Sequence, residues 1–324
     1  MAGSLNVEDM LKLNPRDVYG RKLTELGETD ERIVVVTADL AKSNKLLDFR
    51  DRFPDRFFNV GIAEQNLMGV AAGLALEGKI PVASTFAAFA SMRAHEQVRS
   101  DIGYVDLPVK ILATTSGLTA GIMGPTHQGN EDIAVMRTIP NMTVLAPSDP
   151  LQVSEFIELA IGLPGPVYIR VGRGEDPVLY GEDQKIEIGK AIVAREGTDV
   201  SIVACGTMMK DAIQAHEQLA SEGVSARVLD FHTVKPLDRD AIIAAARETG
   251  TIVTVEDHFV TGGLGSAVAE VVAEEGLGAR VRRLGVPDVF AEVGVPDELY
   301  RHYGYDAAGI VATVRDLILP ARRR

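Results

Sequence analysis

The chain has 324 residues, of which 46% are hydrophobic and 24% are charged, and its formal net charge is −13 at pH 7. This length and composition suffice for two domains with substantial cores, which excludes a disordered chain. The acidic balance argues against a protein that binds nucleic acid or an anionic membrane surface, although it permits a local basic pocket.

Apolar runs typical of strands alternate with helical patterns along the whole chain. We expect strands at 32–37, 81–85, 109–114, 143–146, 167–171, 200–205, 226–229, 252–255 and 280–284. We expect helices at 151–161, 208–222, 239–249, 265–275 and 307–319. Continuous apolar strands separated by helices predict an α/β protein with parallel sheets.

The segment 172–183, which is rich in Gly, Pro and acidic residues, is the expected linker between two domains. We place the first domain at residues 1–185 and a smaller one at residues 186–324.

The single cysteine, Cys205, excludes an internal disulfide and ends an apolar strand, so we expect a small buried residue. A reducing cytoplasm is the simplest setting for such a chain. The N-terminal residues show no signal-peptide pattern, and no uninterrupted apolar run reaches the length of a membrane span. We therefore expect a cytoplasmic protein.

Glu64 begins a predicted helix whose next residues are almost all Gly, Ala, Leu, Met or Val. A helix that is apolar nearly all round is expected to be buried. A carboxylate at the entrance of that environment needs a hydrogen-bonding or charged partner, or else it takes up a proton. The alternative is an ordinary first-turn Glu that the helix dipole favours.

Two further features are candidates for chemistry. Phe86 and Phe89 lie three residues apart just after an expected strand, where they fill either a pocket or the local core. His127 lies in a loop framed by Gly and Pro, which is a poor place for a core histidine and a good one for a substrate contact. The remaining histidines show no metal-ligand spacing with one another or with Cys205, so we predict no metal bound by this chain alone.

Three motifs occur in this order: NVGIAEQ at 59–65, STFAAF at 84–89 and GPTHQG at 124–129. Together they resemble the pyrimidine-binding half of thiamine-diphosphate enzymes, and of the transketolase family in particular. The resemblance runs from about Asp17 to the C-terminal helix. It implies a pyrimidine-type parallel-sheet domain followed by the smaller transketolase C-terminal domain, and a transferase that moves a two-carbon ketol unit from a ketose to an aldose phosphate.

The same resemblance points to a partner. A complete transketolase is about twice as long, and its N-terminal half carries a Gly-Asp-Gly…Asn motif that holds magnesium and the cofactor diphosphate. No Gly-Asp-Gly occurs in these 324 residues. We therefore expect the small subunit of a split enzyme, in which a partner subunit binds the diphosphate and most of the Mg²⁺, assembled as a heterotetramer.

The resemblance also assigns expected roles to the candidate residues. Glu64 corresponds to the carboxyl group that forms a proton relay with the cofactor's aminopyrimidine, and Phe86 and Phe89 to rings that line the pyrimidine pocket. His127 corresponds to a histidine that contacts the donor near its reacting oxygens. Asp39 corresponds to a residue near the cofactor-binding interface.

Sugar-phosphate binding is expected from Arg21, Ser43 and Arg170, which match family positions that grip the phosphate. Two positions depart from the family pattern. Thr115 stands where a histidine is usual, and Met123 stands where an aspartate contacts a donor hydroxyl. A thioether cannot replace that acceptor, so we expect an altered donor, such as a branched or sulfonated ketose.

Three other readings remain open at this stage: the β subunit of a 2-oxoacid dehydrogenase, a deoxyxylulose-phosphate-synthase-like half, and a non-catalytic homologue. The GPTHQG motif argues against the first. In the segment 254–267, a strand is followed by a Gly-rich loop, and we expect Glu256 and His258 there to serve packing or a subunit interface.

Overall fold

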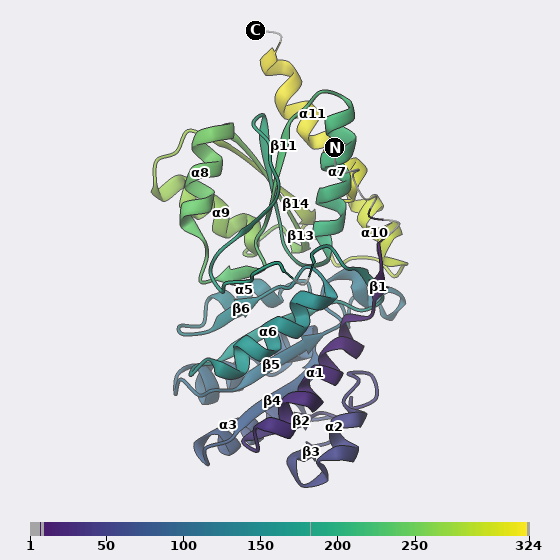
Figure 1. Ribbon diagram of the computed structural model, residues 1–324, viewed down its shortest axis with the longest axis vertical. Coiled ribbons are helices and arrows are strands. Elements are labelled where there is room, and N and C mark those ends of the chain that lie inside the picture. Colours follow the sequence, from purple (N-terminus) through teal and green to yellow (C-terminus); the bar gives the residue numbers. More distant parts are fainter. Residues whose placement is uncertain (1–6, 8–9, 182, 323–324) are drawn as a thin grey trace.

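The computed structural model describes residues 7, 10–181 and 183–322. It contains two α/β units, each built on its own sheet, which are stacked along the long axis of the molecule (Figure 1). The first unit, in purple to teal, occupies the lower part of the view, and the second, in green to yellow, the upper part.

The first sheet has the strand order β12-β6-β7-β5-β4-β2-β3. Its strands are β2 (Ile33–Thr37), β3 (Phe57–Asn59), β4 (Ile80–Phe86), β5 (Lys110–Thr114), β6 (Thr143–Leu145), β7 (Val167–Val171) and β12 (Thr233–Lys235). All neighbours are parallel except β12 and β6. Parallel pairing places the carboxyl ends of β2, β4 and β5 at one edge, where loops can assemble a site.

Alternate residues of these strands enter two different cores, as the period of a strand requires. Val35 packs with helices α1 (Pro15–Thr29), α2 (Leu47–Arg52) and α6 (Pro150–Gly162) on one face. Val36 packs on the other face with α3 (Glu64–Leu76), α5 (Asp132–Arg137) and the π-helical turns η3 (Phe89–Arg93) and η4 (Val98–Gly103). Burial on both faces explains why these strands are continuously apolar.

The second sheet has the order β14-β13-β10-β11-β9. Its strands are β9 (Ile192–Arg195), β10 (Val200–Ala204), β11 (Ala226–Asp230), β13 (Thr251–Phe259) and β14 (Arg280–Val286), and only β9 is antiparallel to its neighbour. Helices α7 (Met209–Ser221), α10 (Pro296–Tyr303) and α11 (Ala307–Arg322) cover one face. Helices α8 (Arg239–Thr249) and α9 (Leu264–Glu274) cover the other.

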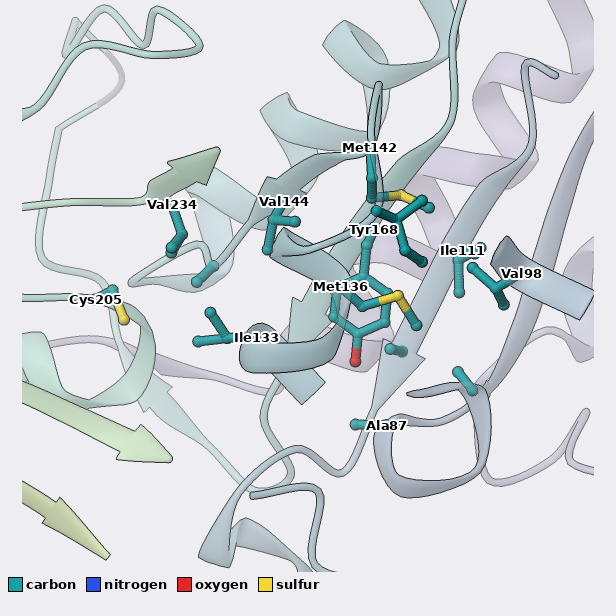
Figure 2. Close-up of a cluster of buried hydrophobic side chains, with 14 of the residues drawn as sticks. Ala87, Val98, Ile111, Ile133, Met136, Met142, Val144, Tyr168, Cys205 and Val234 are labelled. Carbon is teal, nitrogen blue, oxygen red and sulfur yellow. The ribbon is translucent and has the colours of Figure 1, made fainter. Parts of the chain in front are cut away.

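The two units are joined by more than a linker. Strand β12, which follows β11 of the second sheet, pairs antiparallel with β6 and so forms the edge of the first sheet. One apolar cluster also runs through both units. Figure 2 shows part of it, in which Cys205 and Val234 from the second half of the chain approach Ile133, Met136 and Tyr168 from the first. The two units are therefore joined both by strand pairing and by a continuous apolar cluster.

The predicted α/β fold class is confirmed, and the nine expected strands and five expected helices are present with small shifts at their ends. The sequence did not reveal the short strands β3, β9 and β12, nor the pairing of β1 (Lys12–Leu13) with β8 (Asp176–Pro177) inside the expected linker. Further short helical turns are η2 (Pro54–Arg56), α4 (His95–Gln97), η5 (Leu118–Met123) and η6 (Gly206–Met208). Within the described part of the chain, no helix is both long and apolar enough to cross a membrane.

Candidate functional site

The three sequence motifs meet at one edge of the first sheet. Strands β3, β2, β4 and β5 are neighbours in this order, and the segments that follow β3, β4 and β5 lead to Glu64, to Phe89 and to residues 115–130. Residues far apart in the sequence are therefore collected where the parallel strands end.

Glu64 is the first residue of α3 and is only 3% exposed. Arg93 supplies the partner that its burial demands, because Nη1 of Arg93 lies 3.0 Å from each carboxylate oxygen. Arg93 ends the π-helical turn that begins at Phe89, and its side chain is 51% exposed. The pair thus joins a fixed, buried carboxylate to a guanidinium that reaches in from solvent.

Three rings form a cluster beside this pair. Phe86 and Phe89 are stacked, with centroids 5.8 Å apart and planes 27° apart. His127 stands edge-on to both rings, 5.2 Å from the centroid of Phe89 and 6.2 Å from that of Phe86. Arg93 covers the ring of Phe89, with its Cζ 4.2 Å from the centroid. The structure therefore brings Glu64, Phe86, Phe89 and His127 into one group, through Arg93.

His127 is held at the tip of a tight turn. Its backbone N–H donates to the carbonyl of Gly124 at 3.0 Å, and its Nδ1 lies 2.9 Å from Oγ1 of Thr126. Gly124 has φ 73°, and a Cβ there would approach Val293 of the second domain to 2.8 Å. The residue is half-buried, and the side-chain hydrogen bond that holds the ring is made by Nδ1 and not by Nε2.

Asp39 lies on the loop after β2 with φ 59°. It exchanges two hydrogen bonds with Asn59: its backbone N–H donates to Oδ1 at 3.0 Å, and its carboxylate accepts from Nδ2 at 3.1 Å. Oδ1 of Asn59 also accepts from the backbone of Gly61. Asp39 therefore fixes the loop that leads into α3, which is the turn-forming role expected of an Asp in this conformation.

Arg21 and Ser43 are both exposed, and the structure does not place them together by any side-chain contact among the described residues. Arg16 lies instead beside Ser43, donating from Nη1 to the backbone carbonyl of Ser43 at 3.1 Å. It follows the N-cap residue Asn14 and Pro15, so it lies in the first turn of α1.

Arg170 lies in the interior, 4% exposed, and not in the open part of the site. Its Nε donates to the buried carboxylate of Asp132 at 2.9 Å, and Nη2 donates to the carbonyl of Gly129 at 3.2 Å and to that of Asp257. The hydroxyl of Tyr168 also donates a hydrogen bond to the carboxylate of Asp132, at 2.9 Å. These contacts account for Arg170 without a substrate.

Arg173 is a candidate that the sequence analysis missed. It is exposed, and its Nη1 lies 3.1 Å from Sδ of Met123, four residues before His127. Burial, and then the positive charge of Arg173, lower the pKa of Arg16. An exposed guanidinium such as that of Arg173 is suited to bind an oxyanion. The sequence feature that could have identified Arg173 is the pattern Arg-x-x-Arg at 170–173. Its first arginine lies within the apolar strand, and its second lies beyond the end of that strand.

The two departures from the family pattern occupy different surroundings. Thr115 is buried with φ 59°, and its hydroxyl has no hydrogen-bond partner among the described residues. Met123 lies at the end of η5, beside Arg173. Elsewhere, a search of the described residues finds no group of three or more His, Cys, Asp or Glu that could hold a metal ion.

Comparison with known proteins identifies the family. Residues 12–177 match the transketolase pyrimidine binding domain, and residues 189–310 match the transketolase C-terminal domain. A 6-deoxy-6-sulfo-D-fructose transketolase subunit of Clostridium sp. (strain MSTE9) is 42% identical over 302 residues, which are 93% of this chain and 94% of that subunit.

A 1-deoxy-D-xylulose-5-phosphate synthase of Syntrophotalea carbinolica is 43% identical over 303 residues, which are 93% of this chain and 48% of that synthase. A solved structure of a split gene transketolase, described as an inactive β4 tetramer, has a TM-score of 0.88 and 48% identity, and covers 95% of this chain and 99% of that chain. The resemblance that the motifs carry is thereby confirmed, and the chain belongs to the transketolase family, of which it carries the pyrimidine-binding and C-terminal domains.

Proposed function

We propose that this chain is the pyrimidine-binding subunit of a thiamine-diphosphate-dependent transketolase, which transfers a two-carbon ketol unit from a ketose to an aldose phosphate. The observation that carries the proposal is the buried carboxylate of Glu64 beside the cluster of Phe86, Phe89 and His127. A neutral aromatic ring fits against Phe89, and an almost fully buried carboxyl group fits a ring nitrogen that must be protonated.

When bound, thiamine diphosphate supplies the nucleophilic carbon that takes up the two-carbon unit. Glu64 holds a proton at the ring nitrogen, and Phe86 and Phe89 orient the ring and exclude water. His127 faces the same space and donates a hydrogen bond to the oxygens of the reacting sugar, or takes a proton from them. Arg93 must move away from Glu64 and Phe89 before the ring can enter. The free-energy cost of this movement is small, because the guanidinium is already half-exposed to solvent.

Arg16 and Arg173 support an oxyanion at the far end of the sugar. The thioether of Met123 contacts Arg173 where a carboxylate would have neutralised it, and Arg16 lies beside Ser43. The related Clostridium subunit is named for a ketose that carries a sulfonate. We therefore propose a ketose or aldose with a phosphate or sulfonate at the carbon most distant from the carbonyl.

A partner subunit is proposed to bind the cofactor diphosphate and Mg²⁺. Exposed apolar side chains flank the site, as expected for an interface: Ile62 is 79% exposed, Ile122 is 79% exposed and Phe290 is 82% exposed. Ile62 lies two residues before Glu64, and Ile122 precedes Met123. Covering these side chains with a second subunit would close the site, and a heterotetramer of two such pairs is the assembly we propose.

The test is reconstitution with a protein that carries the Gly-Asp-Gly…Asn motif. Isothermal calorimetry should show thiamine diphosphate binding with Mg²⁺ only for the mixture, and neither subunit alone should turn over. The donor panel should include xylulose 5-phosphate and a 6-sulfonated ketose, each with ribose 5-phosphate as acceptor, and pyruvate with glyceraldehyde 3-phosphate as acceptor. Tight Mg²⁺-dependent binding by this chain alone would contradict the division of the cofactor site.

A second function is favoured by the similarity to the deoxyxylulose-phosphate synthase. The same panel separates the two, because formation of 1-deoxy-D-xylulose 5-phosphate from pyruvate would identify the synthase reaction. A complex that binds the cofactor and uses none of the donors would favour a non-catalytic role.

A further inference from the structure

Asp257, near the end of strand β13, reaches from the second domain to the loop that carries His127. Its carboxylate is fully buried and accepts hydrogen bonds from the backbone N–H of Leu118 at 2.9 and 3.0 Å. It also accepts from the hydroxyls of Tyr300 and Tyr305, each at 3.1 Å. Leu118 belongs to the first domain and both tyrosines to the second, so this carboxylate joins the two.

Gly117 makes this approach possible. Its φ is 57°, and a Cβ at this position would lie 2.1 Å from Oδ2 of Asp257, so no side chain fits between the loop and the carboxylate. The N–H of Gly117 donates to the carbonyl of Gly129 at 3.0 Å. Gly129 comes two residues after His127. The contact between Asp257 and Gly117 is therefore linked to His127 through the single hydrogen bond from Gly117 to Gly129.

Gly129 is also packed against the segment that carries the phenylalanines. A Cβ on Gly129 would lie 2.7 Å from Cβ of Ala87 and 3.0 Å from the backbone N of Ala88. A shift of Gly129 therefore changes the separation between His127 and Phe89, whose ring centroids are now 5.2 Å apart. The contact between the domains thus sets the geometry of the candidate site.

Two further contacts hold the same segment to the second domain. The N–H of Phe259 donates to the carbonyl of Asn130 at 2.9 Å, and Nε2 of Gln128 donates to the carbonyl of Glu292 at 3.1 Å. Asn130 and Gln128, which make these two contacts, follow His127 in the chain. The residues before His127 are held by the carboxylate of Asp257, through the backbone N–H of Leu118.

We propose that Asp257 is a positioning residue of the candidate site, which fixes the 115–130 segment so that His127 stands against Phe89. The second domain thereby takes part in the chemistry of the first without contacting substrate. The catalytic part of this inference rests on the function proposed above, whereas the positioning of the loop does not.

Hydrogen exchange measured by mass spectrometry on the full chain tests the positioning directly. Asp257→Asn should speed exchange in peptides covering 115–130 by about tenfold or more, because one of the two oxygens that accept from the N–H of Leu118 becomes an amide nitrogen that cannot accept. Glu256→Gln is the matched control. Glu256 lies on the same strand, is equally buried and accepts from the backbone of Leu264 at 2.7 Å and Gly265 at 2.8 Å within its own domain.

The control should raise exchange around 264–265 and leave 115–130 unchanged. Equal exchange of 115–130 in the wild type and Asp257→Asn, or an equal rise in both variants, would overturn the proposal. Gly117→Ala approaches the same contact from the other side, with the carboxylate intact, and should loosen the same peptides. It keeps the test decisive if Asp257→Asn folds poorly.

The reconstituted enzyme provides the second readout. Asp257→Asn should lower kcat at least about tenfold while KM for the donor changes less than about twofold, since misplacing a group that acts in the transition state lowers kcat rather than ground-state binding. Unchanged kcat in an active complex would overturn the positioning role even if exchange rose. An inactive wild-type complex would instead contradict the proposed function and leave the exchange result standing.

Discussion

The guanidinium of Arg93 covers both features of the site that a pyrimidine ring would use, the carboxylate of Glu64 and the face of Phe89. Nη1 lies 3.0 Å from each oxygen of Glu64, and Cζ lies 4.2 Å from the centroid of Phe89. Arg93 is half-exposed, whereas Glu64 is almost fully buried. The side chain of Arg93 can therefore turn toward solvent, whereas the carboxylate of Glu64 stays buried. Glu64 would then lose its charge partner if a neutral ring bound in place of the guanidinium.

Arg93→Met should strengthen thiamine diphosphate binding by the reconstituted complex by up to about tenfold, since the cofactor no longer displaces a partly exposed ion pair worth about 1 kcal/mol. Calorimetry measures the change. Arg99→Met, which removes an exposed arginine paired with Glu96 at 3.6 Å, is the control and should leave affinity unchanged. Weaker binding by Arg93→Met would show that Arg93 helps to hold the cofactor.

Glu64→Gln should lower turnover on the order of a hundredfold or more, because an amide cannot pass on the proton. Size-exclusion chromatography and thermal melting should show that assembly and fold are retained. Glu77→Gln at the exposed opposite end of α3 serves as the matched substitution and should retain full activity. Near-normal turnover by Glu64→Gln would remove Glu64 from the mechanism.

The two arginines of the 170–173 segment should respond differently to replacement by Ala. Arg173→Ala should raise KM for a phosphorylated or sulfonated substrate with little loss of stability, because it is exposed beside Met123. Arg170→Ala leaves Asp132 buried without its charge partner and should cost on the order of 3–5 kcal/mol of folding free energy. Urea unfolding and steady-state kinetics on both variants separate the roles, and a stable Arg170→Ala with a raised KM would reverse them.

Met123→Asp places a carboxylate beside Arg173, where Sδ now lies 3.1 Å from Nη1. We expect preference to shift toward unmodified ketose donors such as xylulose 5-phosphate, because a hydroxyl regains its acceptor and the arginine loses part of its pull on an oxyanion. Met123→Leu keeps the site apolar and should leave preference unchanged. If the wild type already uses xylulose 5-phosphate efficiently and Met123→Asp changes nothing, the inference of an altered donor is wrong.

Asp230 predicts a pH dependence of stability. Burial raises its pKa to about 6, although it accepts hydrogen bonds from Ser148 at 2.6 Å, Gln152 at 2.9 Å and Tyr180 at 2.9 Å. A raised folded-state pKa contributes stability that is present at low pH and is lost as pH rises through about 6. The stability advantage of the wild type over Asp230→Asn should therefore be fully present below the unfolded pKa and shrink as pH rises from there through about 6.

Urea unfolding of both proteins across that pH range measures the effect as a difference, so the other titrating groups cancel to first order. Tyr180→Phe removes one of the hydrogen bonds that lower the pKa of Asp230, so the pH-dependent loss of stability should extend to higher pH. An advantage that stays constant with pH would show that Asp230 does not titrate in this range.

The sequence by itself determined the α/β class, because strands buried on both faces must be apolar throughout and helices must separate parallel neighbours. It also determined the three motifs and the family. For Glu64 it predicted either a hydrogen-bonding or charged partner or the uptake of a proton, because the helix that Glu64 begins is apolar nearly all round. These are local or compositional properties, and reading them needs no knowledge of which segments meet.

The tertiary structure alone decided the identity of the partners. Arg93 forms an ion pair with Glu64, 29 residues earlier in the chain. Arg93 lies in a π-helical turn, which the periodicity of the sequence did not predict. Strand β12 crosses into the first sheet, and Asp257 reaches Leu118 across 139 residues. Arg170 and Arg173 look alike in sequence, yet one is inside an ion pair and the other is exposed. Such contacts depend on how the two cores pack against each other. Only the tertiary structure therefore distinguishes a side chain buried in the support of the site from one exposed to a ligand.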